Sequence, residues 1–168
     1  MKIILIAFTI CLSSLITIKI GGHNLIIEEF RNIKIAYVRR TGAYGSENQK
    51  LMENFKAYLK ENGLLNDAAI ILGISLDNPI YTPAEKQRYD IGLIIDEHKV
   101  VELDTRKIDD GKYAIFEVPH RKNDIIAFWN NIPKLTIGLS VDKEKPIIER
   151  YSTKKIALHL CEFCIPLK

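Results

Sequence analysis

The sequence has few residues of the kinds that build metal sites and disulfide scaffolds. Its 168 residues include three cysteines and four histidines. Cys161 and Cys164 stand at the spacing of a redox or metal pair, but they fall within a predicted strand, where positions i and i+3 point to opposite faces. The histidines show no metal-ligand spacing along the chain: His23, His98, His120 and His159. We therefore expect no metal, no cofactor and no disulfide.

The chain also lacks a large excess of charge of either sign, and it lacks the common catalytic motifs. The 24 basic residues are offset by 21 acidic ones, and no basic face or helix-turn-helix region is visible, so nucleic acid is not an expected partner. The chain also lacks a phosphate-binding loop, a Gly-x-Ser-x-Gly elbow and a readable Ser/His/Asp arrangement. With 47% hydrophobic residues in 168, it is long enough to bury one good core. We expect a single domain.

The longest apolar run lies at the N-terminus. Residues 3–18 carry no charge and lie between Lys2 and Lys19. A spanning helix needs ~20 residues and the core of a signal peptide ~7–15, so the run fits neither length well. No clean cleavage site follows it, and we favour an uncleaved anchor over a cleaved signal or a buried strand or helix. We expect residues 1–20 to be a membrane anchor or signal segment, residues 21–168 to be the domain, and the protein to be membrane-anchored or exported.

The first half of the domain, residues 33–95, is predicted to form strand, helix, strand, turn and strand. For the helix, Ser46 and Gln49 fit a capping box, and an apolar stripe runs on to Gly63. The predicted strands cover residues 33–38, 69–76 and 89–95.

Residues 112–167 repeat this series with different loops. Asp124 stands where a helix cap is expected, an apolar stripe follows it, and Pro133 is expected to end the helix. The predicted strands cover residues 112–118, 147–152 and 156–165, the last two joined directly as a hairpin. Two such units predict an α+β fold in which two helices cover one face of an antiparallel sheet and a cleft separates the halves.

Several short motifs in the two halves occur in an order that resembles one family. They are Tyr37…Arg40-Thr41-Gly42-Ala43-Tyr44, Leu76-Asp77-Asn78-Pro79, Arg88-Tyr89-Asp90, Gly111-Lys112-Tyr113-Ala114, Pro146-Ile147-Ile148-Glu149-Arg150-Tyr151 and Ile165-Pro166-Leu167. Over residues 30–167 the chain resembles the GyrI-like small-molecule-binding domain, which also forms the effector-binding half of AraC-type and MerR-type multidrug regulators.

The resemblance implies a function as well as a fold. Members of the family bind hydrophobic, often cationic or aromatic ligands in a cleft between the duplicated halves, and a glutamate at the place of Glu149 lies in that cleft. Because no helix-turn-helix region accompanies the domain here, we expect a stand-alone binding module. The chain is also similar to the testis-expressed endoplasmic-reticulum autophagy receptor, which places such a domain behind an N-terminal membrane helix.

The residues themselves make Glu149 the leading candidate for ligand binding. On an extended strand, Glu149 and Tyr151 share one face while Arg150 takes the other. A carboxylate beside a phenol suits an organic cation, because the anion offsets the charge and the ring offers a cation–π face. The alternative is a glutamate that lies at the surface or is paired with an arginine. Further aromatic residues either line the ligand site or fill the core: Tyr37, Tyr89, Tyr113, Phe116 and Trp129.

Two other functions remain open. Some stand-alone members of the family hydrolyse cyclopropane-bearing alkylators. Glu149 would serve as the base if burial raises its pKa and if Tyr37, Tyr89 or Tyr113 supplies a second polar group. A membrane-anchored protein-interaction adaptor would instead bind a peptide in the groove or at an exposed sheet edge. A deep pocket around Glu149 favours a small ligand, and a flat surface favours a protein.

Overall fold

The computed structural model describes residues 16–20 and 23–168. The strands are β1 (Ile16–Ile20), β2 (His23–Phe30), β3 (Lys34–Thr41), β4 (Ile70–Ser75), β5 (Arg88–Ile95), β6 (Asp104–Lys107), β7 (Gly111–Pro119), β8 (Ile148–Ser152) and β9 (Leu160–Pro166). The helices are α1 (Ser46–Glu61), α2 (Lys122–Leu135), the short α3 (Thr153–Ala157) and the 3-10 turn η1 (Ala84–Lys86).

All the described strands join one antiparallel sheet, in the order β1-β2-β7-β9-β8-β4-β5-β3-β6. The first repeated unit is β3-α1-β4-β5 and the second is β7-α2-β8-β9. In both units the third strand lies between the first and the second, and the two units meet where β4 pairs with β8. The predicted α+β class and the predicted duplication are confirmed.

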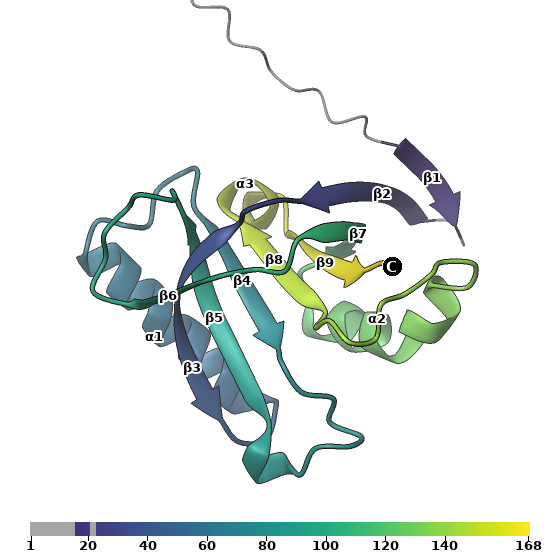
Figure 1. The fold of residues 1–168 in the computed structure, drawn as a ribbon, viewed down its shortest axis with the longest axis horizontal. Helices are drawn as coiled ribbons and strands as arrows, with labels where there is room; N and C mark the ends of the chain where they lie inside the picture. The colour runs from purple at the N-terminus through teal and green to yellow at the C-terminus, as the bar shows by residue number, and fades with distance from the viewer. Residues whose placement is uncertain (1–15, 21–22) are drawn as a thin grey trace, which may run out of the picture.

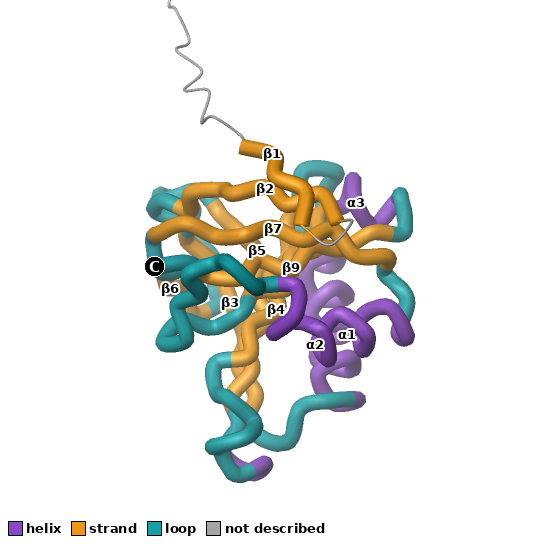
Figure 2. Tube along the Cα trace, turned by 90° about the vertical axis from the view of Figure 1, so that its right-hand side faces the viewer, coloured by secondary structure: helices purple, strands orange, loops and turns teal. Residues whose placement is uncertain are grey.

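The two faces of the sheet bury different residues. One face carries the inner cluster, which is made of Phe30, Ile35, Leu72, Ile74, Ile108, Tyr113, Ile115, Ile148 and Cys164. The other face carries an α1 cluster, which includes Phe55 and Leu59, and an α2 cluster, which includes Phe128 and Phe163. Figure 2 shows the α-helices gathered on one side of the strands. The helices therefore cover one face, as the sequence predicts.

Two short connections force the sheet to curl. Residues 31–33 link β2 to β3 and residues 108–110 link β6 to β7, yet each pair of strands is six places apart in the sheet. In a flat sheet that separation is about 29 Å, whereas the chain across such a link reaches at most about 14 Å. Ile108 donates a backbone hydrogen bond to Ile33 at 2.8 Å and is buried in the inner cluster. The sheet therefore curls around this cluster, with the helices outside (Figure 1).

The start of α1 differs from the predicted capping box. Ser46 is the first helical residue and its side chain caps nothing; the residue before it is Gly45, with φ 136°. The Gly45 carbonyl accepts a hydrogen bond from the Asn48 backbone at 3.0 Å. A glycine backbone in a conformation that side chains disfavour thus replaces the expected serine cap. The helix itself, and its apolar stripe, are confirmed.

The second unit departs from the prediction at both ends of α2. Asp124 lies inside the first turn and accepts a hydrogen bond from Arg121, the residue before the helix, at 2.7 Å. Pro133 lies within α2, which continues to Leu135, so the prediction that Pro133 ends the helix is wrong. Proline removes a single N–H donor, and here the helix runs only two residues past it.

The predicted direct hairpin between residues 147–152 and 156–165 is also wrong. β8 and β9 do pair, but α3 stands between them, with the Ser152 hydroxyl accepting a hydrogen bond from the Lys155 backbone at 3.3 Å. His159, with φ 56°, then turns the chain into β9. The sequence 152–155 was interpreted as a turn, but Ser152 caps a short helix there.

The last five residues of the predicted N-terminal segment form a strand of the sheet. Residues 1–15 lie outside the described part of the chain, and residues 16–20 form the edge strand β1, paired with β2. Among the described residues, no helix has the length and apolar character needed to cross a bilayer. The boundary near residue 21 and the location of the protein stay predictions.

The geometry predicted for the two C-terminal thiols is confirmed and makes them inert. Cys161 belongs to the α2 cluster and Cys164 to the inner cluster, so they lie on opposite faces of β9. Both are buried and free, and burial raises the pKa of each thiol to about 12. We expect mass spectrometry after mild oxidation to find no 161–164 disulfide, and iodoacetamide to modify them only on unfolding. A high yield of the disulfide in folded protein would contradict this.

Candidate functional site

Glu149 lies where the two repeated units meet. On β8 it stands opposite Gly73 of β4 and, on the other side, opposite Phe163 of β9. Its neighbour Ile148 belongs to the inner cluster, so the alternation along the strand turns Glu149 toward the helix-covered face. Tyr151, which shares that face, packs against both the α1 cluster and the α2 cluster. Glu149 as a residue is only partly exposed, and its carboxylate is buried.

Hydrogen-bond donors from both units surround the carboxylate. Tyr151 donates to Glu149 Oε2 at 2.6 Å, and Tyr89, from β5 of the first unit, donates to the same oxygen at 3.3 Å. Burial raises the pKa of Glu149, while hydrogen bonding to Tyr151, Tyr89 and the Trp129 indole opposes that rise. Burial and the Glu149 charge raise the pKa of both phenols as well, so they stay neutral donors at pH 7.

The arginine next in sequence does not pair with Glu149. Arg150 points to the other face of the sheet, where it donates two hydrogen bonds to Glu28, at 3.0 and 2.9 Å, and one to Glu162 at 2.8 Å. No basic side chain forms an ion pair with Glu149 in the described part of the chain. The structure therefore does not contain the arginine-paired glutamate that was one of the alternatives.

Gly73 allows the Tyr89 hydroxyl to reach Glu149. A Cβ placed on Gly73 would lie 2.3 Å from that hydroxyl oxygen and 3.2 Å from Glu149 Oε2. Real Cβ atoms do not approach so closely, so any side chain at this position would displace Tyr89. Sequence reasoning missed Gly73. The only local sign was a glycine inside an apolar strand, which indicates close approach of another group.

An aromatic ring flanks each of the two phenols. The Tyr44 ring, just before α1, meets the Tyr89 ring edge-on at 6.1 Å between centroids. The His120 ring, just before α2, meets the Tyr151 ring edge-on at 5.6 Å. Tyr44 also receives the Asp77 backbone N–H at 3.0 Å, which ties down the loop after β4. His120 was not among the sequence-based candidates.

The structure separates the other predicted aromatic candidates from Glu149. Tyr113 is buried in the inner cluster and stacks on Phe30 at 4.2 Å. Tyr37 packs against the same cluster, so both tyrosines lie on the opposite face from Glu149. Phe116 is on the helix-covered face but is only 1% exposed. Of the predicted aromatic residues, Tyr151, Tyr89 and Trp129 are the ones brought to the carboxylate.

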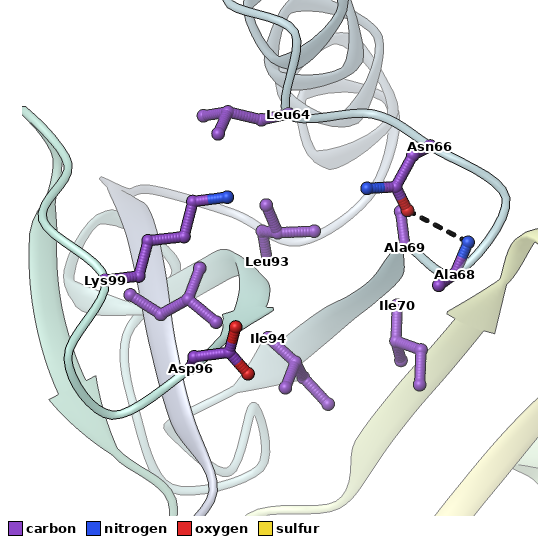
Figure 3. A pocket seen from close by; sticks show the side chains of 10 residues that line it. Leu64, Asn66, Ala68, Ala69, Ile70, Leu93, Ile94, Asp96 and Lys99 are labelled. Atoms are coloured by element: carbon purple, nitrogen blue, oxygen red, sulfur yellow. Dashed lines mark hydrogen bonds between the residues drawn. The ribbon is translucent and has the colours of Figure 1, made fainter.

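Two cavities lie elsewhere on the domain. One, of about 280 Å³, is lined by residues from the start of β4, the end of β5 and the loops beside them (Figure 3). In it, Asn66 Oδ1 accepts a hydrogen bond from the Ala68 backbone at 2.9 Å. The other, of about 770 Å³, lies between the end of β7 and α2 and includes Phe128 and Ile137. Neither is lined by Glu149.

The duplicated α+β units agree with the family that the sequence resembles. The profile of the GyrI-like small molecule binding domain matches residues 23–168. The chain belongs to this family. Its GyrI-like domain is 38% identical over 146 residues to YosT of Bacillus subtilis (strain 168), described as a prophage-derived transcriptional regulator; the match covers 84% of this chain and 97% of that protein.

Solved structures share the fold at low sequence identity. SAV2435, solved with bound tetraphenylphosphonium, matches with a TM-score of 0.57 and 17% identity, over 84% of this chain and 92% of that one. The C-terminal domain of EcmrR matches with a TM-score of 0.66 and 11% identity, over 87% and 98% of the two chains. At these identities the likeness establishes the fold alone.

Because the Tyr89 hydroxyl lies where a Gly73 side chain would be, we expect the effects of substitutions at Gly73 and Tyr89 on the free energy of unfolding to be non-additive. Gly73→Ala should lower the free energy of unfolding by about 1–3 kcal/mol, because the new methyl group overlaps the Tyr89 hydroxyl. In a Tyr89→Phe background the same change should be clearly less harmful, because the hydroxyl is gone. Urea denaturation of the four proteins of this cycle measures the coupling. Equal effects in both backgrounds would show that Tyr89 does not depend on Gly73.

Proposed function

We propose that this GyrI-like domain binds a hydrophobic organic cation against Glu149, between α1 and α2. The observation that carries the proposal is a buried carboxylate that no basic side chain of the described residues neutralises. Buried carboxylates are normally paired, and an unpaired one costs free energy that a bound cation recovers. Among the described residues, the donors to the Glu149 carboxylate are neutral: Tyr151, Tyr89 and Trp129.

The surroundings of Glu149 favour a large ligand with a diffuse charge. Apolar clusters lie on both sides of the carboxylate, one beneath α1 and one beneath α2. A cation with aromatic or alkyl substituents loses little hydration on entering such a place, and the rings of Tyr151 and Trp129 add cation–π attraction. Tetraphenylphosphonium, the molecule bound to SAV2435, has this chemistry. The family description as a small-molecule-binding domain supports the same class of function.

The charge of Glu149 is the part of the proposal that a substitution isolates. Glu149→Gln keeps the shape of the side chain and an oxygen acceptor for the phenols but removes the negative charge. We expect tetraphenylphosphonium to lose on the order of 1–3 kcal/mol of binding free energy, and neutral tetraphenylmethane derivatives to bind as before. Isothermal titration calorimetry with both ligands measures the difference.

The matched control is Glu85→Gln, which makes the same change of net charge at an exposed position in η1. It should leave both affinities unchanged. Equal losses for the charged and neutral ligands in Glu149→Gln would overturn the proposal, since they would show a general disturbance of the site.

The raised pKa of Glu149 gives binding a pH dependence of known sign. Below that pKa the carboxyl is neutral and attracts no cation, so the affinity for tetraphenylphosphonium should rise with pH through a midpoint above the ordinary value of 4.5. The free energy of unfolding of ligand-free protein should fall over the same window, because the folded state holds the proton more tightly than the unfolded state. Both trends should disappear in Glu149→Gln, and a flat wild-type profile would contradict the assignment.

Hydrolysis of cyclopropane-bearing alkylators is a second candidate function. The observation that favours it is the contact between Glu149 and Tyr89, since a glutamate of raised pKa then lies beside a polar group from the other unit. Tyr37 and Tyr113, the other tyrosines predicted for this role, lie on the opposite face. Liquid chromatography of a spirocyclopropyl dienone incubated with the protein tests it. Turnover should vanish in Glu149→Gln, and a rate no faster than in buffer would reject hydrolysis.

A further inference from the structure

The smaller of the two cavities lies where β4 and β5 cease to pair. The pairing of these strands ends at Ile71 and Leu93, although β5 stays paired with β3 as far as Ile95. Past that last pair, the two strand ends and the loops beside them enclose a space of about 280 Å³ (Figure 3). Glu149 does not line it, so it is a place apart from the proposed cation site.

Aliphatic side chains from both faces of the sheet line part of this cavity. Leu93 is buried in the α1 cluster, and Leu64, from the loop after α1, packs against the same cluster. Ile70 and Ile94 pack against the inner cluster. A ligand has to be apolar where it meets these side chains, because a polar group there would lose its hydration without gaining a partner.

Three polar side chains from two loops line the rest of the cavity. Asp96 and Lys99 belong to the turn after β5, in which the Lys99 backbone N–H donates to the Asp96 carbonyl at 3.0 Å. Asn66 belongs to the loop between α1 and β4, and its Oδ1 accepts the Ala68 backbone N–H at 2.9 Å, so its amide nitrogen remains available as a donor. Figure 3 shows the Asp96 carboxylate, the Lys99 nitrogen and the Asn66 amide nitrogen turned toward the same space.

The charges of Asp96 and Lys99 are not neutralised within the described part of the chain. Glu97, in the same turn, pairs with Lys107 at 3.4 Å, and its carbonyl accepts a hydrogen bond from Lys34 at 2.7 Å. In residues 16–20 and 23–168, Asp96 and Lys99 form neither an ion pair nor a side-chain hydrogen bond. One free charge of each sign, beside a donor amide, matches a ligand that also carries one charge of each sign.

We propose that this cavity binds a free α-amino acid with an aliphatic side chain. The ammonium group of the ligand donates to Asp96, its carboxylate accepts from Lys99 and from the Asn66 amide, and its side chain lies against Leu64 and Leu93. The size of the cavity agrees with a small ligand, because the pockets that hold drug-sized molecules span about 300–1,000 Å³. This site is distinct from the one at Glu149, and its ligand carries no net charge.

A set of ligands that differ by one charge tests the proposal. L-leucine carries both charges, L-leucinamide only the positive one and 4-methylpentanoate only the negative one. Lys99→Gln should weaken leucine and 4-methylpentanoate about two- to fivefold, the range for an exposed ion pair, and leave leucinamide unchanged. Asp96→Asn should weaken leucine and leucinamide by a similar factor and leave 4-methylpentanoate unchanged. Nuclear magnetic resonance titrations measure each dissociation constant.

Lys86→Gln and Glu85→Gln, at exposed positions of η1, are the matched controls and should change no constant. Absence of saturable leucine binding to the wild-type protein would overturn the proposal, and so would leucine binding that neither variant weakens. Equal weakening of all the ligands by one variant would also overturn it, because that result indicates a structural role. Binding of tetraphenylphosphonium should be the same in Lys99→Gln, Asp96→Asn and wild-type protein, so the cation site at Glu149 is judged separately.

Discussion

Two three-residue connections constrain the whole domain, because each joins strands that lie six places apart in one sheet. The sheet curls so that these connections close, and the inner cluster fills the inside of the curl. The helices are thereby confined to the outer, convex face, where α1 covers one unit and α2 the other. Helices that pack on a convex face diverge from one another, as α1 and α2 do over their separate clusters. Glu149, at the junction of β4 and β8, therefore lies between two helices and not beneath one of them.

Strand alternation then decides which charges are neutralised within the protein. Inside the curl, Arg150 is held by Glu28 and Glu162, and Asp90, which is 0% exposed, is held by Arg39 and Arg106. In each of these two groups, the acidic and basic side chains are paired with one another. Outside the curl, the donors to Glu149 in residues 16–20 and 23–168 are all neutral. A shift of β8 by one residue would exchange Arg150 with Glu149 between the faces, so the same register that buries Ile148 also sets the chemistry of the site.

The sequence was sufficient to show which side chains share a face of one strand or helix, but it misplaced the cap of α1, the end of α2 and the helix α3. Alternation placed Glu149 beside Tyr151 and opposite in direction to Arg150, and a stripe of apolar residues located α1. It was insufficient wherever two distant strands had to be aligned. Tyr89 reaches Glu149 because β4 and β8 pair with Gly73 opposite Glu149, a register that no local pattern encodes. For the same reason, nothing in the chain showed that Tyr37 and Tyr113 face the inner cluster.

Gly73 and Glu149 also show how corresponding positions of a duplicated domain come to differ at the candidate site. The helices of the two units begin 76 positions apart (122 − 46), and Gly73 and Glu149 are separated by the same 76 positions (149 − 73). The two residues are thus counterparts in the repeats, and they face each other across the approximate twofold axis between β4 and β8. A glutamate in both repeats would bring two buried carboxylates into contact there. The two repeats therefore differ in sequence at the axis that relates them, and the Glu149 side chain of one repeat lies beside Gly73, which has no side chain, of the other.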